Sequence, residues 1–230
     1  MQAAPVEPGV LGARLRQQQL IEDPQYGERE PLELEGRSVL WPDAARWALV
    51  ELVEVTDSGA RRLEEYRFTP ARVTAEVPAF QGSGLPMALL FERTPNGASR
   101  ARIYSTAQLR SIHPRSLGAD RHLLSGRNDT DVLARLVRAV QQADVAASAA
   151  LFEPDGSLQQ SDGALRRGDP QIRAGLEQIM ASGKGDMRYC TRLDEGSRSA
   201  LEIQMPGDRP ALVVCERGAS GGLAALRWYA

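Results

Sequence analysis

The hydrophobic pattern changes its period near Gly185, and this change restricts the possible folds more than any other feature. Before this position apolar side chains recur three and four residues apart, as at Leu133, Leu136 and Val137, which predicts helices. After it they alternate, and short glycine-containing breaks predict antiparallel strands. Helices followed by an antiparallel sheet indicate an α+β domain. The predicted strands are 187–193, 198–205, 209–217 and 223–229.

Three helices are predicted before these strands. Asn128-Asp129-Thr130-Asp131 offers several N-caps for the first helix, and Asp144 resembles the cap of the second. The second helix is predicted to continue to Phe152 and to stop at Pro154-Asp155-Gly156, because proline and glycine break helices. A short strand follows. The third helix is predicted to start with Asp169 as its cap and proline in its first turn.

The first half of the sequence has a less regular pattern. Residues 10–21 predict a short helix, and 111–128, which contains His113 and His122, predicts a linker between two domains. Residues 44–55 are ambiguous, because Pro42-Asp43 resembles a helix start whereas three valines favour a strand. We favour the helix. The predicted strands of this half are 61–67, 72–77, 87–93 and 99–105.

An internal repeat suggests two copies of one module. The segment 86–93, Pro-Met-Ala-Leu-Leu-Phe-Glu-Arg, matches 210–217, Pro-Ala-Leu-Val-Val-Cys-Glu-Arg, in its proline, its Glu-Arg pair and its apolar centre. Gly97 and Gly221 keep the same offset, and an Arg-x-Tyr pattern follows in both copies. We therefore predict a domain at 1–110, a linker at 111–128 and a second domain at 129–230. The first domain is expected to be degenerate, with fewer or shorter helices.

Composition excludes several classes of protein. Hydrophobic residues make up 42% of the chain and charged residues 25%, as in an ordinary globular protein. The 28 basic and 30 acidic residues give no net positive field, so a nucleic-acid partner is not expected. There is no signal-peptide pattern and no apolar run long enough for a membrane span. We expect a cytoplasmic protein without a membrane partner.

The residues that usually hold metals and cofactors are scarce. Two cysteines, Cys190 and Cys215, and two histidines do not supply the four close-set ligands of a structural zinc site. Lys184 is the sole lysine and is predicted to lie in an exposed turn, which argues against Schiff-base chemistry. We therefore expect neither a metal nor a cofactor.

The second half resembles the nuclear transport factor 2-like superfamily, also called SnoaL-like. The resemblance depends on the helical segment 132–152 with Glu153-Pro154-Asp155-Gly156, on Arg167-Gly168-Asp169-Pro170, and on the last strand at 226–229. It covers 129–230 and extends through the repeat to 35–110. The whole chain further resembles bacterial tandem members of this superfamily. The resemblance implies two cone-shaped domains, each a curved antiparallel sheet packed on helices around an apolar pocket. It also implies that sheets pair, here as an intrachain pseudo-dimer, and leaves a homodimer open.

The catalytic residues of two enzyme families in this superfamily are missing. The proton-abstracting Asp of ketosteroid isomerases falls on Gln160, whose amide is not a base, and its oxyanion donors fall on Leu136 and near Val213. Limonene-epoxide-hydrolase-like members use an Arg-x-Asp pair that 199–204 lacks, and their last-strand Asp falls on Trp228. The resemblance therefore implies the fold without either catalytic set.

Glu202 is the one candidate catalytic residue in the second domain. It shares a strand face with Gln204, and if that face points into the cone its carboxyl group can serve as a general acid or base. The alternative is that Glu202 faces solvent or pairs with Arg188 or Arg192. Trp228 and Tyr189 would stack on a flat ligand or pack in the core. The predicted ligand-binding residues are Gln160, Glu202, Gln204, Trp228 and Tyr189.

Three functions remain open. The first is a pocket protein that binds a small apolar molecule without either catalytic set. The second is a cyclase or epoxide-opening enzyme of secondary metabolism, which would use Glu202 or a first-domain carboxylate, Glu64, Glu76 or Glu92. The third is a structural or partner-binding module whose closed cones leave no cavity.

Overall fold

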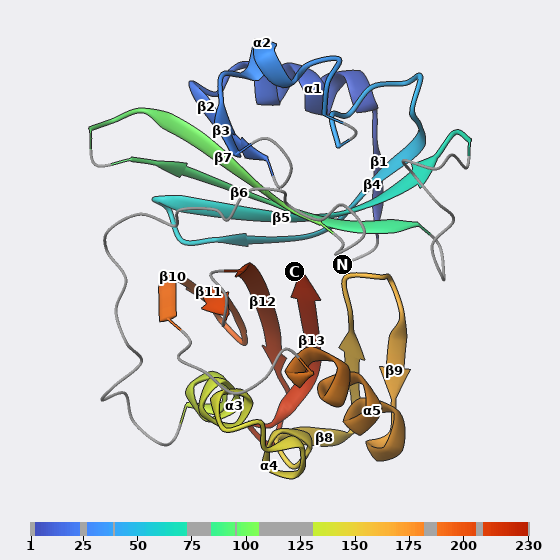
Figure 1. Ribbon diagram of the computed structural model, residues 1–230, viewed down its shortest axis with the longest axis vertical. Coiled ribbons are helices and arrows are strands. Elements are labelled where there is room, and N and C mark those ends of the chain that lie inside the picture. The colour runs from blue at the N-terminus through green and yellow to red at the C-terminus, as the bar shows by residue number, and fades with distance from the viewer. Residues whose placement is uncertain are drawn as a thin grey trace. The chain divides into compact units, whose positions relative to one another are not determined.

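The computed structural model describes residues 3–23, 27–38, 40–72, 84–94, 96–105, 131–181, 188–205 and 209–229. The chain divides into two compact units, the first built mainly from Met1–Arg115 and the second mainly from Ser116–Gln160 and Ala164–Trp228. Each unit combines one sheet with helices on one of its faces, so the predicted α+β class is confirmed (Figure 1). Within the described ranges, no helix has the length and apolar character needed to cross a membrane.

The helices of the second unit begin at acidic residues. Asp131 accepts a hydrogen bond from the backbone N–H of Leu133 at 3.0 Å, and Asp144 accepts one from Ala147 at 2.8 Å. The third helix differs from the prediction, because its N-cap is Gly168, and Asp169 lies in the first turn. The helices are α3 (Val132–Gln141), α4 (Val145–Ala149) and α5 (Asp169–Met180).

The second helix stops earlier than the sequence predicted, and the expected break lies inside a strand. Residue Phe152 begins β8, and Gly156 lies at an irregularity in the pairing of β8 with the last strand. A Cβ atom at Gly156 would lie 2.7 Å from the carbonyl oxygen of Leu223. Glycine is therefore needed here for close approach of two backbones, and not as a helix stop.

The second sheet has six strands in the order β10-β11-β12-β13-β8-β9. Strands β10, β11 and β12 pair antiparallel as predicted, but β13 pairs with β8 in parallel. The expectation of a purely antiparallel sheet is wrong here, because α5 and several strands separate β8 from β13 in sequence and give the long connection that a parallel pair needs. The strands are β8 (Phe152–Gln159), β9 (Leu165–Arg167), β10 (Arg188–Glu195), β11 (Arg198–Met205), β12 (Arg209–Arg217) and β13 (Leu223–Tyr229).

The first unit has a seven-stranded sheet in the order β1-β4-β5-β6-β7-β2-β3, and α1 and α2 lie on one face of it (Figure 1). It is also mixed, because β2 pairs with β7 in parallel. Its helices are α1 (Pro8–Arg16) and α2 (Pro31–Leu34). Its strands are β1 (Ala4–Val6), β2 (Leu20–Asp23), β3 (Gly27–Arg29), β4 (Trp47–Asp57), β5 (Arg61–Pro70), β6 (Leu85–Arg93) and β7 (Ser99–Tyr104).

The prediction of a helix at 44–55 is wrong, because most of this segment belongs to strand β4. The side chain of Asp43 accepts hydrogen bonds from Ala45 and Arg46, so the helix-start signal produces only a turn. Strand β4 then begins, and its Val50 pairs with Phe68 of β5, where both side chains are buried. Tertiary pairing therefore outweighs the local capping signal. All but the first residue of the predicted strand at 72–77, the linker at 111–128 and Lys184 lie outside the described residues.

The two sheets share one strand order. Strands β4-β5-β6-β7-β2-β3 correspond in sequence to β10-β11-β12-β13-β8-β9, and β1 is an addition at the edge of the first sheet. The repeated segments form β6 and β12. Their glutamates Glu92 and Glu216 each pair with an arginine of the following strand, Arg102 at 2.5 Å and Arg227 at 2.7 Å. This is the arrangement that two copies of one module would produce. The described part of the first unit has two helices, of nine and four residues, whereas that of the second unit has three, of ten, five and twelve residues.

Candidate functional site

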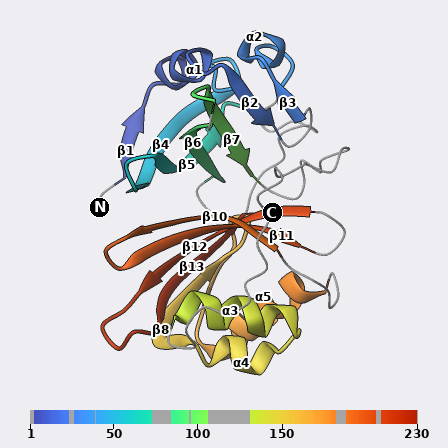
Figure 2. The ribbon, with the colours of Figure 1, turned by 90° about the vertical axis from the view of Figure 1, so that its left-hand side faces the viewer.

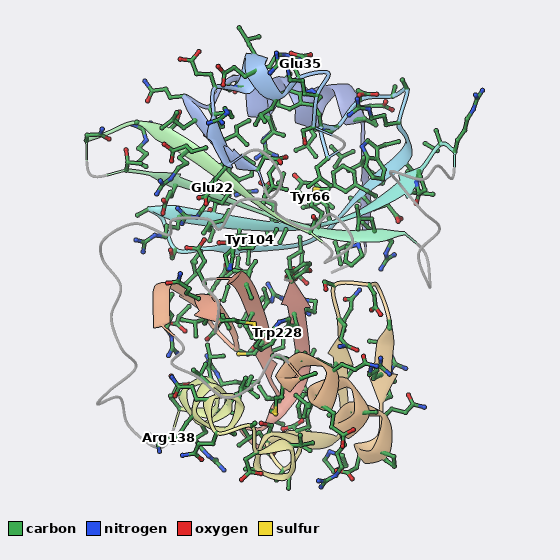
Figure 3. All side chains as sticks on the ribbon, viewed as in Figure 1. Glu22, Glu35, Tyr66, Tyr104, Arg138 and Trp228 are labelled. Atoms are coloured by element: carbon green, nitrogen blue, oxygen red, sulfur yellow. The ribbon has the colours of Figure 1, made fainter. Side chains whose placement is uncertain are left out.

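The helix-facing side of the second sheet has an apolar centre and carries polar side chains beside the start of α3. Trp228 of β13 is 4% exposed and packs in one cluster with Ile203 of β11 and Leu136 of α3. Figure 2 shows the helices of this unit on one face of its sheet, and Figure 3 labels Trp228 on β13. To this cluster the strands contribute Leu158, Leu201, Ile203, Met205, Ala211, Val213, Cys215, Leu223, Leu226 and Trp228.

Gln160, the residue at the position of the isomerase base, holds neighbouring elements together. Its Nε2 donates to the backbone carbonyl of Gly175 in α5 at 3.3 Å. Its Oε1 accepts a hydrogen bond from Nε of Arg166 in β9 at 2.5 Å. Both ends of the amide are therefore engaged, and the side chain links the end of β8 to β9 and α5.

Glu202 and Gln204 lie on the other face of β11. Leu201 and Ile203 belong to the apolar cluster, and successive side chains of a strand point to opposite faces. The structure thus does not bring Glu202 or Gln204 together with Trp228. Tyr189 lies in β10, but its side chain is outside the described ones.

Polar side chains gather where β10 and β11 approach the start of α3. Arg192 pairs with Asp131 and also donates to both carboxylate oxygens of Asp194, at 2.9 and 2.8 Å. Ser199 donates to Asp194 at 2.5 Å and accepts from Arg217 at 2.9 Å. Burial raises the pKa of Asp194, but Arg192 and Ser199 outweigh it and lower the pKa. This network is an ionised link between helix and sheet.

Cys215 lies beside this network and is inert. Its side chain is buried, and burial raises the pKa of the thiol to about 11. The thiol therefore stays protonated at neutral pH, and a protonated thiol is a poor nucleophile and metal ligand. Among the residues with described side chains, no group of His, Cys, Asp and Glu could hold a metal ion.

The first unit contains a buried carboxylate–tyrosine pair on the helix-facing side of its sheet. Glu64 of β5 is fully buried, and the hydroxyl of Tyr66 donates to its Oε2 at 2.5 Å. Its Oε1 accepts hydrogen bonds from Arg14 of α1 at 2.8 Å and from Arg62 at 2.6 Å. Figure 3 shows Tyr66 on the side of the sheet that carries α1.

This pair suits recognition better than proton transfer. Burial raises the pKa of Glu64, but hydrogen bonds from Arg14, Tyr66 and Arg62 outweigh it and lower the pKa. Burial, together with the hydrogen bond to Glu64, raises the pKa of Tyr66. An ionised carboxylate whose two oxygens already accept three hydrogen bonds is a weak base, and the tyrosine is a hydrogen-bond donor that stays protonated.

The sequence contained only part of the signal for this cluster. Glu64 and Tyr66 are two residues apart on one predicted strand, so their shared face was predictable. Arg14 lies 50 residues away from Glu64, and no spacing rule connects them. Of the other first-domain candidates, Glu92 pairs with Arg61, Arg100 and Arg102, and Glu76 lies outside the described residues.

Comparison with known proteins yields likenesses of fold. No family model matches the sequence, and no curated protein matches it. An NTF2-like protein of unknown function from Cytophaga hutchinsonii is 16% identical over 46% of this chain and 92% of its own, with a TM-score of 0.35. A SnoaL-like protein of unknown function from Burkholderia thailandensis is 14% identical over 46% of this chain and 99% of its own, with a TM-score of 0.39.

A third solved structure is a protein with a ketosteroid isomerase-like fold from Catenulispora acidiphila, in complex with trimethylamine. It is 15% identical over 44% of this chain and 85% of its own, with a TM-score of 0.37. The three proteins are described as NTF2-like, SnoaL-like and ketosteroid isomerase-like, which are names used for the superfamily that the sequence resembles. The likeness concerns the fold of somewhat under half of the chain.

Proposed function

We propose that this chain binds a small apolar molecule in its second unit, between α3, α5 and the helix-facing side of the sheet. One observation carries the proposal: between α3, α5 and the sheet, Leu136, Ile203 and Trp228 are buried among other apolar side chains. A ligand that inserts among these side chains has to be apolar, because burial of its apolar surface is favourable and the surrounding side chains offer few hydrogen-bond partners.

The same geometry speaks against the cyclase or epoxide-opening alternative. That chemistry needs an acid or base that faces the ligand. Glu202 lies on the opposite face of β11, the amide of Gln160 is engaged at both ends, and Glu64 of the first unit already accepts three hydrogen bonds. We therefore propose binding without proton-transfer catalysis.

The test is a thermal-shift screen of the full chain with steroid, polyketide and aromatic compounds. At least one class should raise the melting temperature, because a ligand that binds only the folded state stabilises it. The variant Leu136→Ala enlarges the interior of the second unit and should change the ligand-induced shift. Leu11→Ala removes an equally buried leucine from the core of the first unit and serves as the matched control.

The proposal fails if every compound leaves the melting temperature unchanged. It also fails if Leu11→Ala and Leu136→Ala alter the response to a ligand equally, because the ligand would then act outside the second unit. A flat screen would favour the structural or partner-binding module.

A further inference from the structure

The strands of the first unit form a small polar and aromatic cradle, composed of the side chains of Glu64, Tyr66 and Phe91. Glu64 and Tyr66 follow one another on the same face of β5. Phe91 of β6 lies opposite Arg62, the preceding residue on that face. The three groups therefore come from adjacent strands of one sheet, which hold them in place independently of the helices.

A cation from another element occupies this cradle. The guanidinium group of Arg14, on α1, donates to Oε1 of Glu64 at 2.8 Å and to the hydroxyl of Tyr66 at 3.3 Å. Its central carbon lies 5.1 Å from the centre of the Phe91 ring. The guanidinium thus meets a carboxylate, a neutral acceptor and an aromatic ring, which are the groups that proteins use to recognise organic cations.

The charges around Glu64 leave a place for an exchangeable cation. Arg62 also donates to Oε1 of Glu64, at 2.6 Å, but it is shared with Asp57, whose carboxylate lies 3.3 Å away. If Arg14 withdrew, the fully buried Glu64 would retain the hydrogen bond from Tyr66, but its one remaining cationic partner among the described residues, Arg62, also serves a second carboxylate. An incoming cation would restore the lost interaction, which a neutral molecule could not do.

The side chain of Arg14 is placed so that it can move out of the cradle into solvent. Its side chain remains 40% exposed although its guanidinium reaches a carboxylate with no exposure. The residue lies in the last turn of α1, which ends at Arg16. A flexible side chain that reaches solvent can rotate away without unfolding the helix.

We propose that the cradle of Glu64, Tyr66 and Phe91 is a binding site for a small molecule that carries a guanidinium or ammonium group, and that Arg14 is its internal occupant. A ligand of this class displaces Arg14 and makes the same contacts. The site differs from the apolar site of the second unit in location and in ligand chemistry, so either proposal can fail alone.

Titration of the full chain with methylguanidinium tests this proposal, with tetramethylammonium as a second cation. Urea, which has a similar planar shape but no charge, controls for shape, and sodium chloride controls for ionic strength. The native chain should bind methylguanidinium in competition with Arg14. Arg14→Ala should bind it about tenfold more tightly or better, because a competing occupant reduces the apparent affinity by the fraction of open sites. Urea should bind neither protein.

Two variants locate the binding. Arg16→Ala removes the other arginine of the last turn of α1, which pairs with Glu35 at 2.5 Å and has the same 40% exposure, so it should keep the native affinity. Glu64→Gln should abolish binding in the native and the Arg14→Ala background. If Arg14→Ala does not fold, the comparison of the native chain with Glu64→Gln decides whether the cation binds at Glu64. The proposal is overturned if the native chain binds no cation, if urea binds equally well, or if Glu64→Gln binds as tightly as the native chain.

Discussion

Tyr66 donates a hydrogen bond to Glu64 over 2.5 Å, from two residues along the same strand. The tyrosine hydroxyl donates to Oε2 of Glu64, whereas Arg14 and Arg62 both donate to Oε1. The carboxylate is therefore held ionised inside the first unit by donors from a strand and a helix. Substitution of Glu64 and substitution of Tyr66 should therefore lower the free energy of unfolding by different amounts.

Glu64→Gln should lower the free energy of unfolding by roughly 1–3 kcal/mol, because hydrogen bonds to a charged group are replaced by weaker ones and a buried amide donor lacks a partner. Tyr66→Phe should cost less, about 1 kcal/mol, because it removes one hydrogen bond and keeps the ring packing. Urea denaturation of both variants measures the two values. A larger loss in Tyr66→Phe than in Glu64→Gln would contradict this account.

The pair of Glu92 with Arg102 predicts an acid-sensitive contribution to stability. Burial raises the pKa of Glu92, but Arg102 and Arg100 outweigh it and hold the pKa at about 2, against an ordinary value of 4.5. Because the folded-state pKa is depressed, this contribution is fully present above pH 4.5 and is lost as the pH falls toward about 2.

The comparison of native chain and Glu92→Gln isolates this effect. The difference in urea midpoint between them should be largest at neutral pH and should shrink as the pH falls below 4.5, because protonated glutamate and glutamine are both neutral. Glu33→Gln, which replaces a glutamate that is more than half exposed, is the control and should change the urea midpoint little. A pH-independent difference for Glu92→Gln would contradict the prediction.

Asp131 has two separable roles at the start of α3. Asp131→Asn keeps an acceptor for the backbone N–H of Leu133 but removes the charge that pairs with Arg192. Asp131→Ala removes both and should cost about 1 kcal/mol more, the typical value of an N-cap. Hydrogen exchange of the first turn of α3 should follow the same order. Equal losses in the two variants would show that the cap contributes nothing.

Gly156→Ala should destabilise the second unit by about 1–3 kcal/mol, because its methyl group would overlap the carbonyl oxygen of Leu223 at 2.7 Å and push β8 from β13. Gly9→Ala is the control: no atom lies within 4 Å of the added methyl group, and alanine favours the helix α1. It should be neutral or stabilising by up to about 1 kcal/mol. Thermal unfolding of both variants separates the cases, and a neutral Gly156→Ala would count against the close pairing.

The sequence predicted the regular parts of the fold because their periodicity reflects burial on one face. The strands that contain Ile203 and Val213 alternate as expected, and the helix with Leu136 packs on them. The prediction failed at 44–55, where Asp43 resembles a helix cap but forms only a turn. The capping signal at Asp43 acts only on its neighbouring residues and forms a turn. Residues 47–57 form β4 because they pair with β5, which a local signal does not reveal.

The candidate sites were predictable only in part. The inward position of Trp228 was implied by the family resemblance, whereas alternation alone places Glu202 on either face until the register is known. The contact of Arg14 with Glu64 joins a helix to a strand across 50 residues and requires the folded chain. Single-sequence patterns do not encode such distant contacts.

The parallel pairing of β8 with β13 has a consequence for the order of folding. In the second sheet β8 and β9 attach to the other strands through β13, the last strand of the unit to be synthesised. One edge of the β8–β9 pair therefore stays unpaired until nearly the whole unit has left the ribosome. Because the closing step joins segments that are distant in sequence, it should be the slow step in the assembly of this unit.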